Sequence, residues 1–334
     1  VAFNAQLSGL RLFSGASTDA NEASALSYQR QVIDIYNNSW GPSDSGTVLG
    51  GPGPLTSEAL ADSIANGRGG LGSIYVWAGG NGAEYGDNVN ADGYANSRYT
   101  IAVAASTNYG TRASYSEYGS PLLVNAPSHG GSAAITTTAY GSTGCNTSFG
   151  GTSSAAPLVA GVVALMLEAN PSLTWRDVQH ILVQTAEKNA PGDSGWFNNG
   201  AGLHFNHAFG FGRVDAGAAV ALAQSWTTVG PEQTIDSGTL SVNQNFPGGS
   251  GFVTRTFEVT DALTLESVDV VFNATHPSRG KVYIELISPS GTTSVLMPGR
   301  PFDFNSNYNN WRFNTVANWG ESAVGTWTLR AKDI

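Results

Sequence analysis

Ser153 is the residue in this sequence that is best placed to act as a nucleophile. The stretch SFGGTSSAAPLVAGVVALML, residues 148–167, puts Ser153 behind two glycines and ahead of a long run of small and apolar residues. A glycine-rich turn that leads into a helix presents a side chain where free N–H groups and the helix dipole stabilise negative charge. A serine nucleophile also needs a base, usually histidine, and a carboxylate that orients this base.

The five histidines of the chain offer no convincing base for Ser153. His129 lies in a Gly/Ser-rich loop that we expect at the surface. In an α/β-hydrolase the acid and the histidine follow the serine, so three histidines could serve there: His180, His204 and His207. That fold expects Gly-x-Ser-x-Gly, and Ala155 stands in place of the second glycine. His180 also falls inside a predicted amphipathic helix, where a structural role is the better interpretation.

Short apolar runs alternate with helical patterns up to about residue 225. Segments 31–40, 72–82 and 99–106 predict buried strands, and segments 55–70 and 173–188 predict helices. Thr56 is the predicted N-cap of the first helix, and Thr174 with Asp177 resembles a capping box in the second. The helix after Ser153 is apolar nearly all round, which predicts complete burial. This alternation predicts a parallel, doubly wound α/β sheet with helices on both faces.

The pattern changes after residue 228, where strands of alternating polarity predict an antiparallel β-sandwich. We therefore divide the chain into residues 1–228 and residues 229–334. Segment 1–13 predicts a core strand with its lead-in, so we expect that sequence upstream of residue 1 has been removed. The last residues alternate up to the final position, so we expect the sandwich to be cut at its C-terminus as well.

Composition argues against one class of partner and favours one location. The 334 residues include 15 Lys+Arg and 25 Asp+Glu, and the resulting net charge of −10 disfavours nucleic-acid binding. Only 12% of the residues are charged, and the many Gly, Ser, Thr and Asn residues are typical of a secreted bacterial protein. No signal peptide is visible, and no apolar run approaches the length of a membrane span.

Four acids and one asparagine follow predicted strands. Taken singly they are ordinary turn residues, but the ends of parallel strands gather at one edge of a sheet, where α/β sites form. The residues are Asp44, Asn81, Asp87, Asp92 and Glu117.

The nucleophile segment and several long stretches resemble subtilisin-like serine proteases of the kexin/furin (proprotein convertase) branch. The stretches include NNSWGPSDSG, GGLGSIYVWAGGNG, DGYANSRYTIAVAAS and GFGRVDAGAAVALAQSWTTV, and the β-rich tail resembles the P domain, which is jelly-roll-like. The match covers essentially the whole chain. It implies that the catalytic Asp and His precede residue 1, that the first strands of the fold are absent, and that residues 1–334 alone are inactive.

The resemblance also assigns roles to single residues. Ser153 would be acylated, and Asn81 would donate its amide to the oxyanion. Asp44, Asp87 and Glu117 match a calcium site, and Ca²⁺ takes about six to eight oxygen ligands. Asp44 and Asp92 match the acids of the primary pocket, which would select Arg or Lys. The remaining substrate-binding residues implied are Ser39, Trp40 and Gly41 through their backbone, and Glu22 and Tyr94 at more distant subsites.

Three departures and one alternative remain. Gly50 stands where furin-like enzymes have an acid, which weakens a demand for basic residues at distant subsites. Val89 and Ala91 replace common cysteines, whereas Cys145 is kept; the resemblance implies an upstream disulfide partner, and an inert buried thiol is the alternative.

The implied partners are protein or peptide substrates, a propeptide or chaperone, and the missing N-terminal segment. A non-catalytic binding module would have no need for both Ser153 and Asn81.

Overall fold

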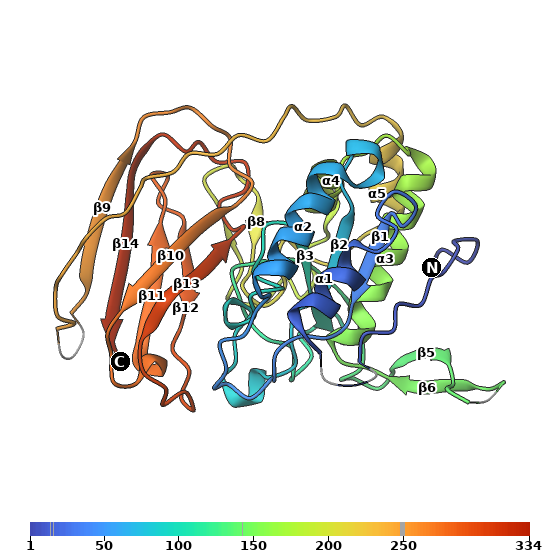
Figure 1. The fold of residues 1–334 in the computed structure, drawn as a ribbon, viewed down its shortest axis with the longest axis horizontal. Coiled ribbons are helices and arrows are strands. Elements are labelled where there is room, and N and C mark those ends of the chain that lie inside the picture. Colours follow the sequence, from blue (N-terminus) through green and yellow to red (C-terminus); the bar gives the residue numbers. More distant parts are fainter. Residues whose placement is uncertain (14, 16, 142, 248–250) are drawn as a thin grey trace.

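The N-terminal region of the computed structural model is built on a four-stranded sheet (Figure 1). The structure describes residues 1–13, 15, 17–141, 143–247 and 251–334. The strands are β1 (Ile35–Asn38), β2 (Ile74–Ala78), β3 (Thr100–Ser106) and β4 (Leu122–Pro127), in the order β1-β2-β3-β4, and every neighbouring pair is parallel. β2 and β3 are buried at every residue, as expected for strands covered on both faces.

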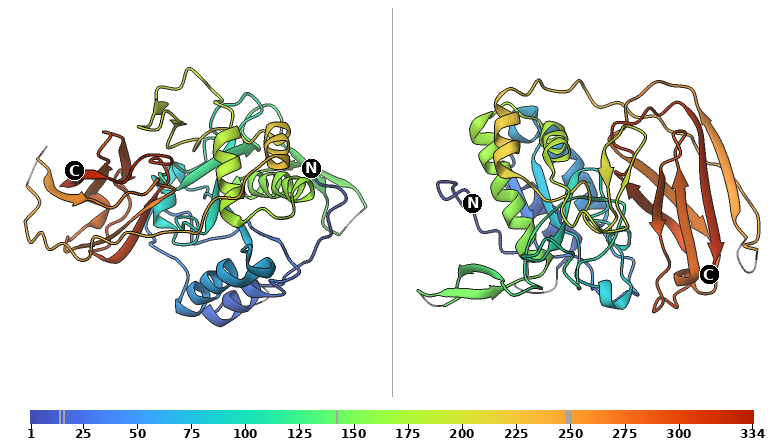
Figure 2. Two further views of the ribbon diagram at one scale, coloured as in Figure 1. Left: turned by 90° about the horizontal axis from the view of Figure 1, so that it is seen from above. Right: turned by 180° about the vertical axis from the view of Figure 1, so that it is seen from behind.

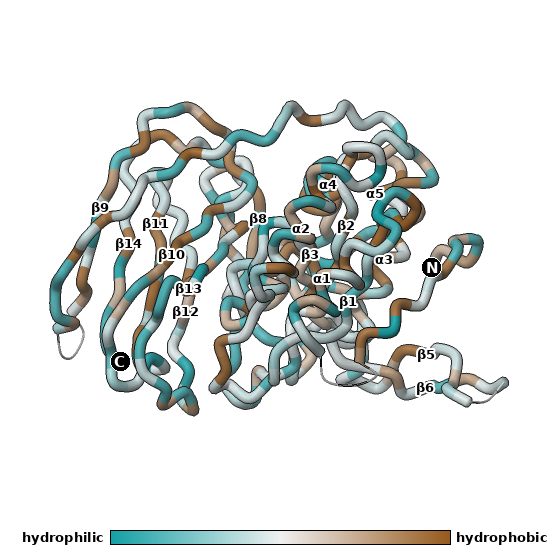
Figure 3. The backbone as a smooth tube through the Cα atoms, viewed as in Figure 1, coloured by the Kyte–Doolittle hydropathy of each residue, from teal (hydrophilic) through white to brown (hydrophobic). Residues whose placement is uncertain are grey.

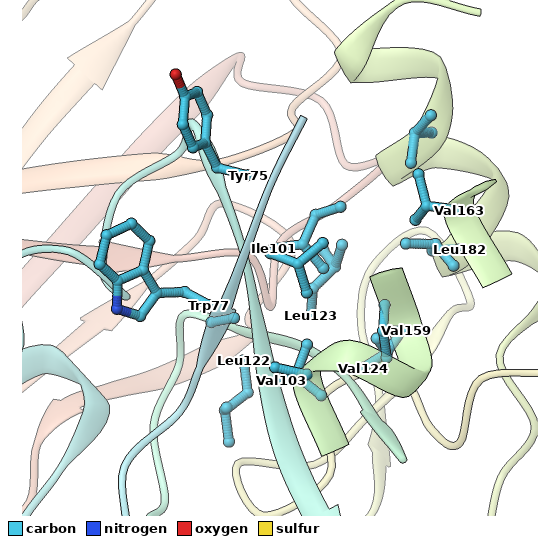
Figure 4. Close-up of a cluster of buried hydrophobic side chains, with 14 of the residues drawn as sticks. Tyr75, Trp77, Ile101, Val103, Leu122, Leu123, Val124, Val159, Val163 and Leu182 are labelled. Atoms are coloured by element: carbon cyan, nitrogen blue, oxygen red, sulfur yellow. The ribbon is translucent and has the colours of Figure 1, made fainter. Parts of the chain in front are cut away.

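Helices cover the two faces of this sheet. α1 (Asp19–Ser27) and α2 (Pro54–Asn66) lie on one side, and α3 (Thr152–Ala169) and α5 (Ala216–Gln224) lie on the other (Figure 2). α4 (Trp175–Thr185) packs against α5 and β4. Figure 4 shows side chains from α3 and α4 beside those of the strands in one apolar cluster. The predicted doubly wound sheet is confirmed.

α3 is buried on one face only, so the prediction that it is buried all round is wrong. Val159 and Val163 are completely buried, but Leu165 is half-buried and Glu168 is exposed. A single sheet covers the helix, and its far side therefore keeps contact with solvent. Among the described residues α3 alone is long and apolar enough to cross a membrane by length and composition. The expectation that no apolar run approaches this length is therefore wrong. In this structure α3 packs against the strands of the sheet as a core helix.

Helix starts show how local patterns and distant contacts compete. The capping box of α4 forms between Thr174 and Asp177 as predicted. α2 instead begins at Pro54 with Gly53 as N-cap, so the prediction of Thr56 as N-cap is wrong. Asp19 of α1 accepts hydrogen bonds from the amides of residues 55 and 56, both at 2.9 Å, and so takes the place of a local cap.

Segment 1–13 forms no strand, contrary to the prediction. Phe3 and Leu7 are 92% and 97% exposed. The apolar pattern of this segment therefore does not correspond to burial against the described residues.

The C-terminal region is a β-sandwich with antiparallel strands, as predicted. One sheet has the order β12-β11-β14-β9 and the other pairs β10 with β13. The strands are β9 (Val253–Val259), β10 (Val268–Ala274), β11 (Val282–Ile287), β12 (Thr293–Met297), β13 (Tyr308–Thr315) and β14 (Gly325–Asp333). The described residues between 226 and 252 form no helix or strand, and the predicted boundary at 228/229 falls there. Few apolar positions mark this connection in Figure 3.

Short elements complete the fold. The hairpin β5–β6 projects from the body (Figure 1), and a smaller hairpin joins β7 to β8. Their bounds are β5 (Ile135–Thr138), β6 (Cys145–Phe149), β7 (Phe197–Asn198) and β8 (His204–Phe205). Single 3₁₀ turns occur at Gly67–Gly70, Ala83–Tyr85, Val89–Ala91 and Arg279–Lys281.

Candidate active site

Ser153 is the second residue of α3, directly after a turn that only glycine adopts easily. The N-cap Gly151 has φ +76°, a left-handed conformation that a side chain would strain. Ser153 is half-buried, and its hydroxyl has no hydrogen-bond partner among the described residues. The Ser39 hydroxyl donates to the Ser153 carbonyl at 2.9 Å, which ties the end of β1 to the nucleophile turn. The arrangement leaves the Ser153 hydroxyl available at a helix N-terminus.

Asn81 is held beside this turn by Thr152. Its Oδ1 accepts hydrogen bonds from the Thr152 amide at 2.8 Å and from the Thr152 hydroxyl at 3.0 Å. These two bonds fix the orientation of the Asn81 amide. Its Nδ2 lies on the side away from Thr152 and donates a hydrogen bond to Oδ2 of Asp44 at 3.3 Å. Sequence reasoning missed Thr152, and its only signal was a hydroxyl residue directly before the nucleophile.

The four acids found by sequence line one small cavity of about 10 Å³, room for a single water-sized body. Asp44 follows β1, Asp87 and Asp92 lie in the loop after β2, and Glu117 lies in the loop after β3. The cavity walls also include glycines. A Cβ on Gly80 would lie only 2.3 Å from Oε1 of Glu117, so the carboxylate needs the glycine there.

Burial dominates the electrostatics of this cavity. It raises the pKa of Glu117 well above its ordinary value, Asp87 and Asp44 raise it further, and a 3.0 Å hydrogen bond from the Gly82 amide opposes the shift. Burial also raises the pKa of Asp87, although Arg300 of the sandwich lies 3.0 Å from its Oδ1 and opposes this. A cation that entered the cavity would therefore favour the ionised forms of these acids over the protonated ones.

The donor set suits a hard cation, although the carboxylates are not gathered into a ready metal centre. Within the described ranges no three His, Cys, Asp or Glu side chains lie close enough to hold a metal as placed. The three carboxylates of the predicted calcium site, Asp44, Asp87 and Glu117, nevertheless line the same cavity. Oxygen donors of this kind are those that Ca²⁺ prefers. The calcium site stays a prediction.

Asp92 is half-buried and lies against Gly41. Its Oδ1 accepts from the amides of Tyr94 at 2.7 Å and Ala95 at 3.2 Å, and its Oδ2 lies 2.7 Å from where a Cβ of Gly41 would be. Burial raises the pKa of Asp92 to about 7, and the nearby acids Asp44 and Asp87 add to the rise. The segment 39–41, predicted to bind the substrate backbone, therefore passes directly over the predicted specificity carboxylate.

The remaining predicted substrate-binding residues also come together. The Tyr94 hydroxyl donates to Glu22, and the Tyr94 ring stacks on Trp77 with centroids 5.1 Å apart. The Trp77 indole N–H donates to the carbonyl of Trp40 at 2.6 Å. One aromatic cluster thus positions both the chain at Trp40 and the two residues predicted for distant subsites, Glu22 and Tyr94.

No histidine among the described residues forms a hydrogen bond with Ser153. His180 binds Glu266 at 2.8 Å, and Nε2 of the half-buried His207 accepts a hydrogen bond from the amide of Val295 at 3.1 Å. His204 packs against Trp196, and His276 lies in the sandwich. His129 is exposed, as predicted. These engagements remove the basis of the α/β-hydrolase alternative.

Cys145 is a free and exposed thiol at the start of β6. The alternative of an inert buried thiol is therefore wrong. The upstream disulfide partner stays a prediction.

Comparison with known proteins identifies the family. Residues 1–212 match the subtilase family, and residues 265–334 match the proprotein convertase P-domain. The chain belongs to the subtilase family. Together with the convertase relatives, the P-domain match places it in the predicted kexin/furin branch.

The similar curated proteins are convertases. A PC3-like endoprotease (variant B) of Hydra vulgaris is 43% identical over 100% of this chain and 48% of its own length. The rat proprotein convertase subtilisin/kexin type 6 is 44% identical over 100% of this chain and 37% of its own length. Human neuroendocrine convertase 2 is 42% identical, over 98% of this chain and 54% of its own. The chain thus spans about half or less of the relatives it matches.

A solved structure has the same fold. The serine protease of Aeromonas sobria superposes with a TM-score of 0.81 over 96% of this chain and 68% of that chain, at 22% identity. At this identity the likeness shows the fold alone.

Proposed function

We propose that the full-length protein is a secreted, calcium-dependent serine endopeptidase that cleaves peptide bonds after Arg or Lys. The observation that supports this most is the placement of the Ser153 turn and the fixed Asn81 amide beside a cavity lined by Asp44 and Asp92. A nucleophile, an oxyanion donor and two carboxylates that would pair with a basic side chain then lie at one site. The family match and the convertase relatives support the reaction class.

In the proposed reaction the Ser153 hydroxyl oxygen attacks the carbonyl carbon while its proton passes to a histidine supplied upstream of residue 1. One N–H of the Asn81 amide donates to Asp44, and its second N–H, together with the N-terminus of α3, would receive the developing oxyanion. The C–N bond then breaks, the amine leaves with the proton, and water hydrolyses the acyl-enzyme. Removing one such oxyanion donor costs roughly 10²- to 10³-fold in turnover, a figure established on a subtilisin.

The chain 1–334 alone should turn over an Arg-amide substrate at a negligible rate. Members of a catalytic triad act as a unit, as subtilisin variants show, so loss of the base removes most of the rate. A rate near that of the full-length enzyme would refute the view that the base lies upstream.

Calcium would be held by Asp44, Asp87 and Glu117 and would offset the charge of these buried carboxylates. Glu117→Gln should therefore reduce the rise in melting temperature that calcium causes in the full-length enzyme. An unchanged calcium response would rule this site out.

The specificity test is Asp92→Asn. Loss of one partner of a buried charge pair typically costs about 2–5 kcal/mol, so kcat/KM for Arg substrates should fall about 30-fold or more. An apolar substrate side chain never used that charge, so its rate should stay. If Arg and Leu substrates lose activity equally, Asp92 is only a turn residue and the pocket assignment fails.

The proposed function also implies which classes of partner the protein binds. We propose peptide or protein substrates, together with a propeptide or chaperone that assists folding. The Aeromonas sobria protease has been solved in complex with a chaperone, which supports this class of partner. The non-catalytic module remains the alternative, and the activity of the full-length enzyme decides between the two.

A further inference from the structure

The loop that carries Asp87, Asp92 and Tyr94 is held from behind by the sandwich. We propose that the P domain fixes the position of the specificity carboxylate Asp92, and that Asn90 is the positioning residue through which it acts. The proposal rests on the function proposed above and extends it, because it makes the P domain a structural part of the primary pocket.

Asn90 is completely buried and bonds across the interface between the two regions. Its Nδ2 lies within hydrogen-bond distance of three acceptors that share its two hydrogens: the carbonyls of Leu296 and Asn314, both at 3.0 Å, and the Ser120 hydroxyl at 2.9 Å. Its Oδ1 accepts the amide of Asn314 at 2.8 Å. One side chain thereby bonds to both backbone polar groups of Asn314 in β13.

The backbone around Asn90 is held as well. The Trp311 indole donates to the Asn90 carbonyl at 2.8 Å, and the Asn96 side chain donates to the carbonyl of Arg312 at 2.8 Å. Ala91 is 3% exposed and belongs to the apolar core of the sandwich. Asp92 therefore lies between anchored neighbours on both sides.

On its other side the same loop meets the first loop of the catalytic region. Gly93 donates to the Gly50 carbonyl at 2.7 Å, and Gly50 donates to the Ala91 carbonyl at 3.2 Å. The close approach of Gly51 to Gly93 leaves no room for a side chain on either residue. The loop is thus clamped between the sandwich and the segment that follows Asp44. Movement of the sandwich contact would shift Asp92 relative to Gly41.

Asn199 makes a contact comparable to that of Asn90 at another place in the same interface. Asn199 is 5% exposed, and its Nδ2 donates to the carbonyls of Ala317 and Trp319, both at 2.9 Å. It joins the same two regions through the same chemistry, but its neighbours carry none of the specificity residues. Asn199→Ala therefore weakens the contact between the sandwich and the N-terminal region without touching the loop that carries Asp92.

The experiment uses the full-length enzyme with Asn90→Ala, Trp311→Phe or Asn199→Ala. kcat and KM are measured per titrated active site for matched peptides with Arg or Leu before the cleaved bond, and hydrogen exchange is followed in segment 87–96. A misplacement of about 1 Å can cost about 100-fold, so Asn90→Ala should lower the Arg/Leu ratio of kcat/KM about 10- to 100-fold, mainly through KM for Arg. Trp311→Phe keeps the aromatic packing and should lower the ratio about 3-fold, since it removes one hydrogen bond.

Both variants should also speed exchange in segment 87–96, whereas Asn199→Ala should leave the ratio and this exchange as in the wild type. An unchanged ratio in both Asn90→Ala and Trp311→Phe overturns the proposal, as does an equal fall in Asn199→Ala. If Asn90→Ala does not fold, Trp311→Phe decides. A wild-type enzyme with no preference for Arg refutes the proposed function and the specificity role together; exchange in the variants then still reports whether the sandwich holds the loop.

Discussion

Glu266 joins the sandwich to α4 through a bidentate ion pair, and its removal should destabilise the protein in a pH-dependent way. Arg176 donates to both carboxylate oxygens of Glu266, through Nε at 2.8 Å and through Nη2, and His180 binds at 2.8 Å. Burial alone would raise the pKa of Glu266, but the hydrogen bonds from His180 and Arg176 outweigh it and lower the pKa to about 2. The perturbation is Glu266→Gln, which keeps the shape and removes the charge.

The magnitude follows from the pKa. A fall from 4.5 to about 2 corresponds to about 3 kcal/mol of folding free energy, and partial solvent screening reduces this to about 2–3 kcal/mol, since the side chain is 19% exposed. Because folding lowers the pKa, the stabilisation is fully present above the unfolded value of 4.5 and is lost as the pH falls toward about 2. The wild-type advantage over Glu266→Gln should shrink across that window.

The assay is urea unfolding at a series of pH values, because urea is uncharged and does not screen the ion pair. Glu187→Gln is the matched control: its partner is Arg213, and the two side chains are 56% and 41% exposed, so the loss should be about 0–1 kcal/mol. A loss for Glu266→Gln no larger than for the control would refute the reasoning, as would a difference that stays constant from about pH 5 to about pH 2.

Three further outcomes are expected. Thr152→Val removes the hydroxyl that orients Asn81 and should lower kcat of the full-length enzyme about 10-fold with KM unchanged; a normal kcat would show that the Thr152 amide suffices. Burial lowers the pKa of His207 to about 4, so stability should fall as the pH drops from 6.5 to about 4, and His207→Gln should flatten the plot of melting temperature against pH. Gly41→Ala would place a Cβ 2.7 Å from Oδ2 of Asp92 and should lower the Arg/Leu ratio of kcat/KM while the melting temperature stays within a few degrees, since Gly41 is exposed; an unchanged ratio would contradict this placement.

Sequence patterns predicted the fold where the deciding contacts are local. The runs 72–82 and 99–106 contain the buried strands β2 and β3, because a strand covered on both faces needs apolar residues at every position. The capping box at Thr174 and Asp177 spans three residues, so the sequence alone shows both partners.

Predictions failed where a distant segment decides. The cap of α2 comes from Asp19, which no pattern near residue 54 could indicate. The burial of α3 depends on how many layers cover it, and an apolar composition does not state that number. Asn90 reads as a loop residue in the sequence, because its partner Asn314 lies 224 positions away.

The candidate site was predictable as a set of acids at strand ends, but its charge balance was not. Arg300 of the sandwich, whose side chain is fully buried, lies 3.0 Å from Asp87 and 2.9 Å from Asp303, and Arg279 also binds Asp303. No residue near Asp87 in the sequence indicates that an arginine of the sandwich contacts its carboxylate.

This balance bears on what the cavity can bind. The two arginines, Arg279 and Arg300, offset Asp303 and Asp87, which leaves three further carboxylates at the cavity without a cation among the described residues: Asp44, Asp92 and Glu117. Buried charges persist only when opposite charges compensate them. A cation beside these carboxylates would favour their ionised forms, because the raised pKa values of Asp92 and Glu117 otherwise favour the protonated forms. In the proposed function, basic selectivity and calcium dependence would then share one electrostatic origin, since each cation would keep carboxylates of this cavity ionised.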